Sequence, residues 1–307
     1  MLASVASRLL VALALATLPA AAPATPLDPS ADGPFDVGVT TLTLVDDTRA
    51  RTLVTEVWYP ARATGRDAAP RGGRYPLVLT AHGNCGFRTN YEYLTIPLAA
   101  RGFVVAAPDF PEFTKSMCDT GTPSPSVVEP AKDLSFLRTV FHDRVGPAAA
   151  LARIVRGRRT GLVGHSLGGA VVVNAALADP DMRAVVGLAP LATAGQGRAL
   201  AALEPRPAVL VVVGTADGLF PLVQAFFGGL VAPAFLVTIA GGTHSGLTDM
   251  DASLTPEQLA REQMLARRYV VAFIERYLAH ERGFARFLVP ADAAAEGTDV
   301  ALTPAGG

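Results

Sequence analysis

The chain has few charged residues and only two cysteines. Charged side chains make up 17% of its 307 residues, and 26 basic against 27 acidic groups leave a net charge of -1. This charge balance does not indicate binding to nucleic acid or to an anionic membrane surface. The sequence also has no internal repeat, no long run of like charges and no Cys/His cluster with the spacing of metal ligands. Half of the residues are hydrophobic, so the chain can bury the core of one large domain or two small ones.

A short apolar stretch stands near the N-terminus. Arg8 supplies a positive charge, residues 9–18 are apolar, and small residues follow. This is the pattern of a secretory signal peptide, with cleavage expected after Ala22 or Ala24, and the apolar run is too short to span a bilayer comfortably. We therefore expect a signal peptide over 1–24 and a mature protein that is secreted or periplasmic, without a stable membrane anchor. An uncleaved amphipathic leader is the alternative.

Export gives the two cysteines a possible structural role. Cys85 and Cys118 each follow a predicted core strand, on what should be the same edge of the sheet, so their loops are expected to be neighbours. An oxidising compartment would allow them to pair. The sequence does not fix the Cα separation that a disulfide requires, so a disulfide and two free thiols both remain open.

Eight segments have the pattern of β-strands. Two of them, over 35–45 and 51–59, alternate in part and are joined by a turn, which predicts an antiparallel hairpin at one edge of a sheet. The other six are mainly continuous apolar runs separated by helical segments, at 75–81, 103–108, 160–163, 184–188, 208–214 and 234–239. Continuous apolar strands that alternate with helices predict an α/β protein with a mostly parallel, eight-stranded sheet covered on both faces.

These segments form a single predicted domain over 25–290. No linker divides it, and no long insertion follows the strand at 184–188, so little or no lid is expected. The best-delimited helix begins at Thr255-Pro256-Glu257-Gln258, a capping box with proline at the first helical position. The sequence does not decide whether the C-terminal tail over 291–307 is ordered, and disorder there is one alternative.

The segment Gly164-His165-Ser166-Leu167-Gly168-Gly169 joins the buried strand at 160–163 to an apolar helical segment at 170–178. A serine on the tight turn between a strand and a helix is the nucleophile elbow of the α/β-hydrolase fold. The glycines two before and two after the serine leave no Cβ to crowd the strained turn. The Leu167 amide is then expected to form half of an oxyanion hole. The pattern alone also fits an ordinary Gly-rich turn, so the rest of the chain has to decide.

A nucleophilic Ser166 should be followed along the chain by an acid and then a histidine. Asp217 lies on the loop after the strand at 208–214, and His244 lies on a Gly-rich loop after the strand at 234–239. The carboxyl ends of parallel strands meet at one edge of the sheet, so both side chains are expected near Ser166. The chemistry needs an imidazole to take the serine proton and a carboxylate to fix the imidazole tautomer.

Each of these assignments has an alternative. Asp217 also suits a helix cap, and His244 also suits a surface loop. Asp249 and Asp251 are competing carboxylates, but both follow His244 and so break the expected order. The other histidines have structural explanations: His165 in packing at the elbow, His82 in the loop after the strand at 75–81, and His142 and His280 at the ends of helices.

A second oxyanion donor is expected on the loop that begins His82-Gly83-Asn84. The backbone amide of Asn84 is the candidate to face the amide of Leu167. Apolar residues flank the loops of the acid and the base, and they form either an acyl pocket or ordinary core: Leu219, Phe220, Phe226, Phe227 and Leu247.

Taken together, these motifs resemble one branch of the α/β-hydrolases. His82-Gly83-Asn84-Cys85-Gly86-Phe87-Arg88-Thr89-Asn90-Tyr91 and the segment over 98–109 are similar to the platelet-activating-factor acetylhydrolase-like group, close to the dienelactone hydrolase-like and polyester-hydrolase branches. The resemblance runs from about Phe35 to Tyr277. It implies serine esterase chemistry, with an acyl-enzyme on Ser166 and an oxyanion held by backbone amides. True dienelactone hydrolases use a cysteine nucleophile, so that narrower activity is not expected here.

The sequence therefore predicts a secreted serine carboxylic-ester hydrolase that needs no metal or organic cofactor. Its catalytic residues are Ser166, Asp217 and His244, with the amides of Asn84 and Leu167 as the oxyanion hole. The expected substrate is a small-molecule or polymeric ester: a short-acyl ester, a lipid or a polyester. The oligomeric state is open, with a monomer as the default. The alternatives are a serine peptidase or amidase, and a non-catalytic binding protein on a hydrolase scaffold.

Overall fold

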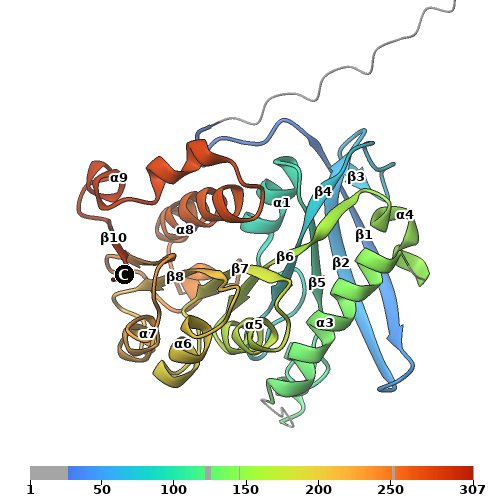
Figure 1. Ribbon diagram of the computed structural model, residues 1–307, viewed down its shortest axis with the longest axis horizontal. Coiled ribbons are helices and arrows are strands. Elements are labelled where there is room, and N and C mark those ends of the chain that lie inside the picture. The colour runs from blue at the N-terminus through green and yellow to red at the C-terminus, as the bar shows by residue number, and fades with distance from the viewer. Residues whose placement is uncertain (1–26, 122–125, 145, 251–252, 307) are drawn as a thin grey trace, which may run out of the picture.

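In the computed structural model, residues 27–121, 126–144, 146–250 and 253–306 are described, and they build one ten-stranded sheet (Figure 1). The strands lie in the order β10-β9-β8-β7-β6-β4-β5-β2-β1-β3. Their bounds are β1 Asp36–Asp46, β2 Arg51–Ala61, β3 Gly65–Arg66, β4 Tyr75–Ala81, β5 Val104–Pro108, β6 Val155–His165, β7 Met182–Leu188, β8 Ala208–Gly214, β9 Ala234–Ile239 and β10 Val300–Pro304.

Helices cover both faces of this sheet. On one face α3 contacts α5, α5 contacts α6, and α6 contacts α7, while α1 packs against α8 on the other (Figure 1). The helices are α1 Glu92–Ala100, α2 Lys115–Asp119, α3 Val128–Asp143, α4 Ala149–Ala152, α5 Leu167–Ala178, α6 Ala194–Ala201, α7 Phe220–Phe227, α8 Pro256–Tyr277 and α9 Pro290–Ala295. Because helices shield both faces, every residue of β4, β5 and β8 is buried. Continuous apolar runs are the pattern that such strands require.

The sheet contains the eight predicted strands and two more. From β5 to β9 the neighbouring strands pair in parallel, whereas the hairpin β1–β2 joins β5 through an antiparallel pairing. The additional strands are β3, which runs parallel to β1, and β10, which pairs antiparallel with β9. The described part of the tail over 291–307, whose order the sequence left open, contains most of α9 and all of β10.

The segment over 1–24 lies outside the described residues. Within the described residues, only α6 stands between β7 and β8, so no large lid follows β7. No described helix is long and apolar enough to cross a membrane. The described residues also contain no group of three or more His, Cys, Asp or Glu side chains arranged to hold a metal ion.

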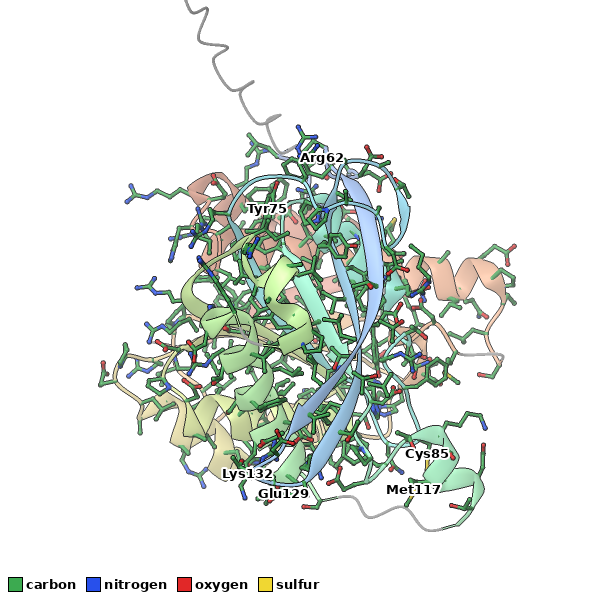
Figure 2. The ribbon with its side chains drawn as sticks, turned by 90° about the vertical axis from the view of Figure 1, so that its right-hand side faces the viewer. Arg62, Tyr75, Cys85, Met117, Glu129 and Lys132 are labelled. Carbon is green, nitrogen blue, oxygen red and sulfur yellow. A yellow bond between two sulfur atoms is a disulfide. The ribbon has the colours of Figure 1, made fainter. Side chains whose placement is uncertain are left out.

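Cys85 and Cys118 form a disulfide whose Cα atoms are 5.5 Å apart. Cys85 follows β4, and Cys118 lies in the short helix α2, which Figure 2 shows beside it. The two loops also pair through their backbones, since the Cys85 amide donates to the Phe113 carbonyl at 2.9 Å and the Lys115 amide to the Gly86 carbonyl at 3.0 Å. The loop after β4 is thus fixed to the loop after β5.

Candidate active site

Ser166 lies at the turn between β6 and α5, with φ 55° and ψ -118°. A positive φ is uncommon for a residue that is not glycine, and such strain is often found at functional sites. The two flanking glycines are required by close packing. A Cβ on Gly164 would lie 2.2 Å from the Gly168 carbonyl oxygen, and one on Gly168 would lie 2.2 Å from the Ala81 carbonyl oxygen. The strand, the helix and β4 can therefore approach this closely only around glycine.

Asp217 and His244 meet at the carboxyl edge of the sheet, after β8 and β9. Nδ1 of His244 lies 2.8 Å from Oδ2 of Asp217, whose side chain is 1% exposed. The other carboxylate oxygen of Asp217 accepts the Leu219 amide at 2.8 Å. Burial opposes ionisation of Asp217, but the hydrogen bonds from His244 and Leu219 outweigh it and hold the pKa of Asp217 below its usual value. A charged carboxylate is thus available to orient the imidazole.

Ser166 and His244 line one cavity of about 190 Å³. Because Nδ1 of His244 is bonded to Asp217, Nε2 is the ring nitrogen left to act as a base. Within the described residues the Ser166 hydroxyl has no hydrogen bond. In an unliganded active site the contact between serine and histidine is often long and tightens when substrate binds.

The loop after β4 leaves one of its backbone amides free. Three of the four amides over 83–86 are bonded inside the protein: Gly83 to the Tyr91 hydroxyl at 3.1 Å, Cys85 to the Phe113 carbonyl at 2.9 Å and Gly86 to the Gly83 carbonyl at 3.1 Å. The Asn84 amide has no partner in the part of the chain that the structure describes, and Asn84 lines the cavity at Ser166.

His82 explains how the Asn84 amide is oriented. Its Nδ1 donates to the Gly83 carbonyl at 2.8 Å, and its Nε2 accepts the Phe110 amide at 3.0 Å. Burial lowers the pKa of His82 to about 4, so the ring is neutral at neutral pH. The N–H and C=O of a trans peptide point in opposite directions. A Gly83 carbonyl that faces His82 therefore directs the Asn84 N–H away from His82.

The Leu167 amide, next to Ser166, also has no hydrogen-bond partner within the described residues. Leu167 is the first residue of α5, and the first N–H groups of a helix have no partner within the helix. The N-terminus of a helix also carries partial positive charge, which favours an anion there. Both backbone amides expected from the sequence are thus without a hydrogen-bond partner within the described residues.

The cavity wall differs from the acyl pocket that the sequence suggested. None of Leu219, Phe220, Phe226, Phe227 and Leu247 lines the cavity, and Phe226 and Leu247 are buried in the core. The wall instead includes residues that the sequence analysis did not single out as site residues: Asn90, Tyr91, Ser245, Thr248 and Met250. They come from two segments far apart in the chain, so sequence spacing gave no signal for them.

The competing carboxylate Asp249 has a different role. It accepts the Glu92 amide at the start of α1, and Nε2 of Gln263 donates to it at 3.0 Å. Burial raises the pKa of Asp249 to about 6. Asp249 therefore caps α1 and ties it to the loop of His244. Asp251 lies outside the described residues.

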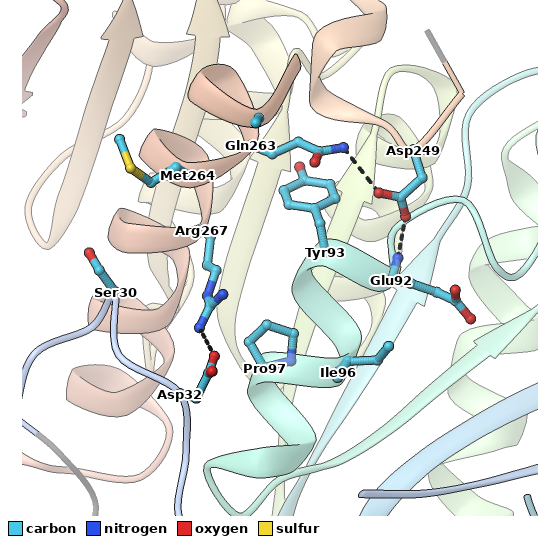
Figure 3. Close-up of a pocket in the computed structure, with 11 residues that line it drawn as sticks. Ser30, Asp32, Glu92, Tyr93, Ile96, Pro97, Asp249, Gln263, Met264 and Arg267 are labelled. Carbon is cyan, nitrogen blue, oxygen red and sulfur yellow. Dashed lines mark hydrogen bonds and ion pairs between the residues drawn. The ribbon is translucent and has the colours of Figure 1, made fainter. Parts of the chain in front are cut away.

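A larger cavity of about 530 Å³ lies between α1, α8 and the segment that contains Asp32 (Figure 3). Of its charged groups, Arg267 binds Asp32 at 2.8 Å, and Asp249 is held as described above. It is not lined by Ser166, Asp217 or His244. The smaller cavity, which is lined by Ser166 and His244, is therefore the candidate active site.

Comparison with known proteins agrees with this fold. The model of the alpha/beta hydrolase family matches residues 77–296, so the chain belongs to this family. The chain is also similar to the solved structure of a ferulic acid esterase from Streptomyces cinnamoneus, with 26% sequence identity and a TM-score of 0.65. That match covers 85% of this chain and 93% of the esterase. A search of curated proteins found no match. The family and the neighbour together support an esterase-type hydrolase.

Proposed function

We propose that the protein hydrolyses carboxylic esters through an acyl-enzyme on Ser166. The observation that carries the proposal is the pair of His244 and Asp217, whose Nδ1 and Oδ2 lie 2.8 Å apart. His244 lines the same cavity as Ser166, which has a positive φ. A serine hydroxyl becomes an effective nucleophile when an imidazole takes its proton and a carboxylate orients that imidazole. The esterase neighbour agrees with an ester as the substrate.

The reaction follows from the positions of these groups. The Ser166 oxygen attacks the ester carbonyl carbon while Nε2 of His244 takes the hydroxyl proton. The oxyanion that forms accepts hydrogen bonds from the amides of Asn84 and Leu167. When the C–O bond breaks, the imidazolium returns the proton to the leaving alcohol oxygen. Water then attacks the acyl-enzyme with His244 as base, which releases the acid and restores Ser166.

The size of the cavity favours a small acyl group. Its volume of about 190 Å³ is below the roughly 300–1,000 Å³ of pockets that enclose a drug-sized ligand. A short acyl chain or a single aromatic ring suits this space, whereas the rest of a lipid or polyester chain would have to lie outside it. The acyl group named for the neighbouring esterase, ferulic acid, carries one aromatic ring, which makes an aryl ester a direct substrate to test.

We also propose that the protein is exported. The apolar stretch at the N-terminus and the Cys85–Cys118 disulfide agree with this, because disulfides persist mainly in oxidising compartments. Expression of the full chain in a bacterial host, followed by fractionation and N-terminal sequencing, tests it. A mature protein that begins at Pro23 or Thr25 outside the cytoplasm is expected. Full-length protein retained in the cytoplasm would contradict export.

The activity is tested with p-nitrophenyl esters from acetyl to palmitoyl, methyl ferulate and a matched p-nitroanilide. Wild type is compared with Ser166→Ala and with Ser116→Ala, which changes an exposed serine in α2. Esters of short acyl groups or of ferulate should be cleaved by wild type and Ser116→Ala but not by Ser166→Ala. A preference for the anilide would instead indicate a peptidase or amidase. No ester hydrolysis and no labelling of Ser166 by a fluorophosphonate would refute the proposal.

A further inference from the structure

A buried chain of hydrogen bonds connects the three segments of the proposed active site. The Gly83 amide donates to the Tyr91 hydroxyl at 3.1 Å, and that hydroxyl lies 3.1 Å from Nδ1 of His165. On its other side, Nε2 of His165 lies 3.0 Å from the backbone carbonyl of His244. The chain thus runs from the loop of the Asn84 amide, through the residue before Ser166, to the loop of the base.

Only one arrangement of protons satisfies this chain. The His244 carbonyl can only accept, so Nε2 of His165 must carry a proton. Burial, together with the nearby His244, lowers the pKa of His165 to about 3, so the ring is neutral and Nδ1 has no proton. The Tyr91 hydroxyl therefore donates to Nδ1 of His165, and its oxygen accepts the Gly83 amide. Burial also raises the pKa of Tyr91, which keeps it a donor.

Both side chains lie on the wall of the cavity at Ser166 and are almost fully buried. Tyr91 and His165 are each 5% exposed. A buried polar group that loses its partner retains its full desolvation cost, and the neighbouring backbone shifts to recover a hydrogen bond. The segments that would shift are those of the oxyanion amide and the base.

We propose that His165 and Tyr91 are positioning residues for the ester hydrolysis proposed above, on which this inference rests. His165 holds the backbone of His244 while Asp217 holds its side chain, so the imidazole is fixed from two sides. Tyr91 holds the Gly83 amide, and the next amide in the chain is that of Asn84. The pair therefore sets the base and the oxyanion donor relative to Ser166, and it acts through these groups.

Two substitutions of His165 separate its two hydrogen bonds. In His165→Asn the side-chain oxygen replaces Nδ1, so the bond from Tyr91 is retained and the bond to His244 is lost. In His165→Gln the side-chain nitrogen replaces Nε2, so the bond to His244 is retained and the bond from Tyr91 is lost. Tyr91→Phe keeps the aromatic ring and removes both bonds of the hydroxyl. Tyr59→Phe is the control, because it removes a buried hydroxyl that donates to the Ala68 carbonyl at 2.8 Å, away from Ser166.

We expect His165→Asn and Tyr91→Phe to lower kcat about 10- to 100-fold, the effect typical of displacing a catalytic group by a fraction of an ångström to one ångström, with KM within about threefold. His165→Gln should retain kcat within about fivefold, because the base remains held. Tyr59→Phe should lose stability and keep kcat. Circular dichroism and denaturation show whether each variant is folded at the assay temperature.

The two His165 variants decide the outcome. Equal kcat values for His165→Asn and His165→Gln, or losses that only follow stability, would mean that the ring merely packs at the elbow, and the inference would be wrong. Wild-type activity is measured first. If wild type hydrolyses no ester, the proposed function and this inference fall together. If it does, the variants test the positioning role alone.

Discussion

The close packing at the elbow predicts that Gly168→Ala disables the site while an equivalent substitution elsewhere does not. A Cβ on Gly168 would lie 2.2 Å from the Ala81 carbonyl oxygen and 2.5 Å from the His82 carbonyl oxygen. Non-bonded heavy atoms are most stable at about 3.5–4.0 Å, so α5 and the loop after β4 would have to separate by about 1 Å. These two elements carry the Leu167 and Asn84 amides, and the substitution would therefore widen the proposed oxyanion hole.

The effects of Gly168→Ala on stability and on kcat can both be estimated. Overpacking in a core costs about 1–3 kcal/mol, so the free energy of unfolding should fall by that amount. Displacement of a catalytic group by about 1 Å, or loss of one oxyanion donor, lowers kcat about 100-fold or more. KM should change little, because the donors act on charge that develops in the transition state.

Gly195→Ala is the matched control. Gly195 is the second residue of α6, as Gly168 is of α5, and the nearest atom to its added Cβ would be Oγ1 of Thr193 at 3.7 Å. Alanine favours a helix over glycine by up to about 1 kcal/mol, so this variant should be as stable as wild type or slightly more stable. Urea denaturation and steady-state kinetics on the best ester measure both variants. A Gly168→Ala enzyme with wild-type stability and kcat within threefold would refute the steric argument.

Three further predictions follow from the site. Asp217→Asn should lower kcat about 10³- to 10⁴-fold with the fold intact in circular dichroism, because the amide cannot hold the imidazole in the required tautomer; a mild loss would contradict the proposed role. Cys118→Ser removes the disulfide that closes a loop of 33 residues and should lower the free energy of unfolding by about 3–4 kcal/mol. Reduction of the wild type should have the same effect, whereas a reductant should not change the stability of the variant. The neutral ring of His165, with a pKa of about 3 against about 6.5 when unfolded, contributes stability in full above about pH 6.5 and loses it as the pH falls toward 3. The stability advantage of wild type over His165→Gln should therefore shrink by about 2 kcal/mol between pH 7.5 and 5, and a constant difference in denaturation would show that the ring is not buried neutral.

The strands of the central sheet could be predicted from the sequence because the pattern that identifies each strand lies within the strand itself. A strand buried on both faces needs a continuous apolar run, and Val209 to Val213 of β8 form such a run. The capping box at Thr255 likewise fixes the start of α8 through contacts within four residues. By contrast, β10 alternates buried and exposed residues over only five positions, and it is held by pairing with β9. Nothing within so short a segment indicates that partner.

The cavity wall was less predictable than the candidate catalytic residues. Ser166, Asp217 and His244 each follow a predicted strand, so the topology alone brings their loops to one edge. Whether a side chain near those loops faces the cavity or the core depends on local direction, and Phe226 faces the core. Met250 and Asn90 line the cavity, and no spacing in the sequence singled out either of them as a site residue.

The hydrogen bonds of His165 and Tyr91 could not be predicted from the sequence. A histidine next to Ser166 can be noticed in the sequence, but its partner stands 74 residues away, and the direction of each hydrogen bond follows only from three contacts taken together. In the described structure those bonds, with the contacts of His82 and the disulfide, satisfy or fix the groups that surround the site. The Asn84 and Leu167 amides and the serine hydroxyl have no hydrogen-bond partner within the described residues. The proposed reaction needs these groups free, and the surrounding bonds hold the segments that carry them.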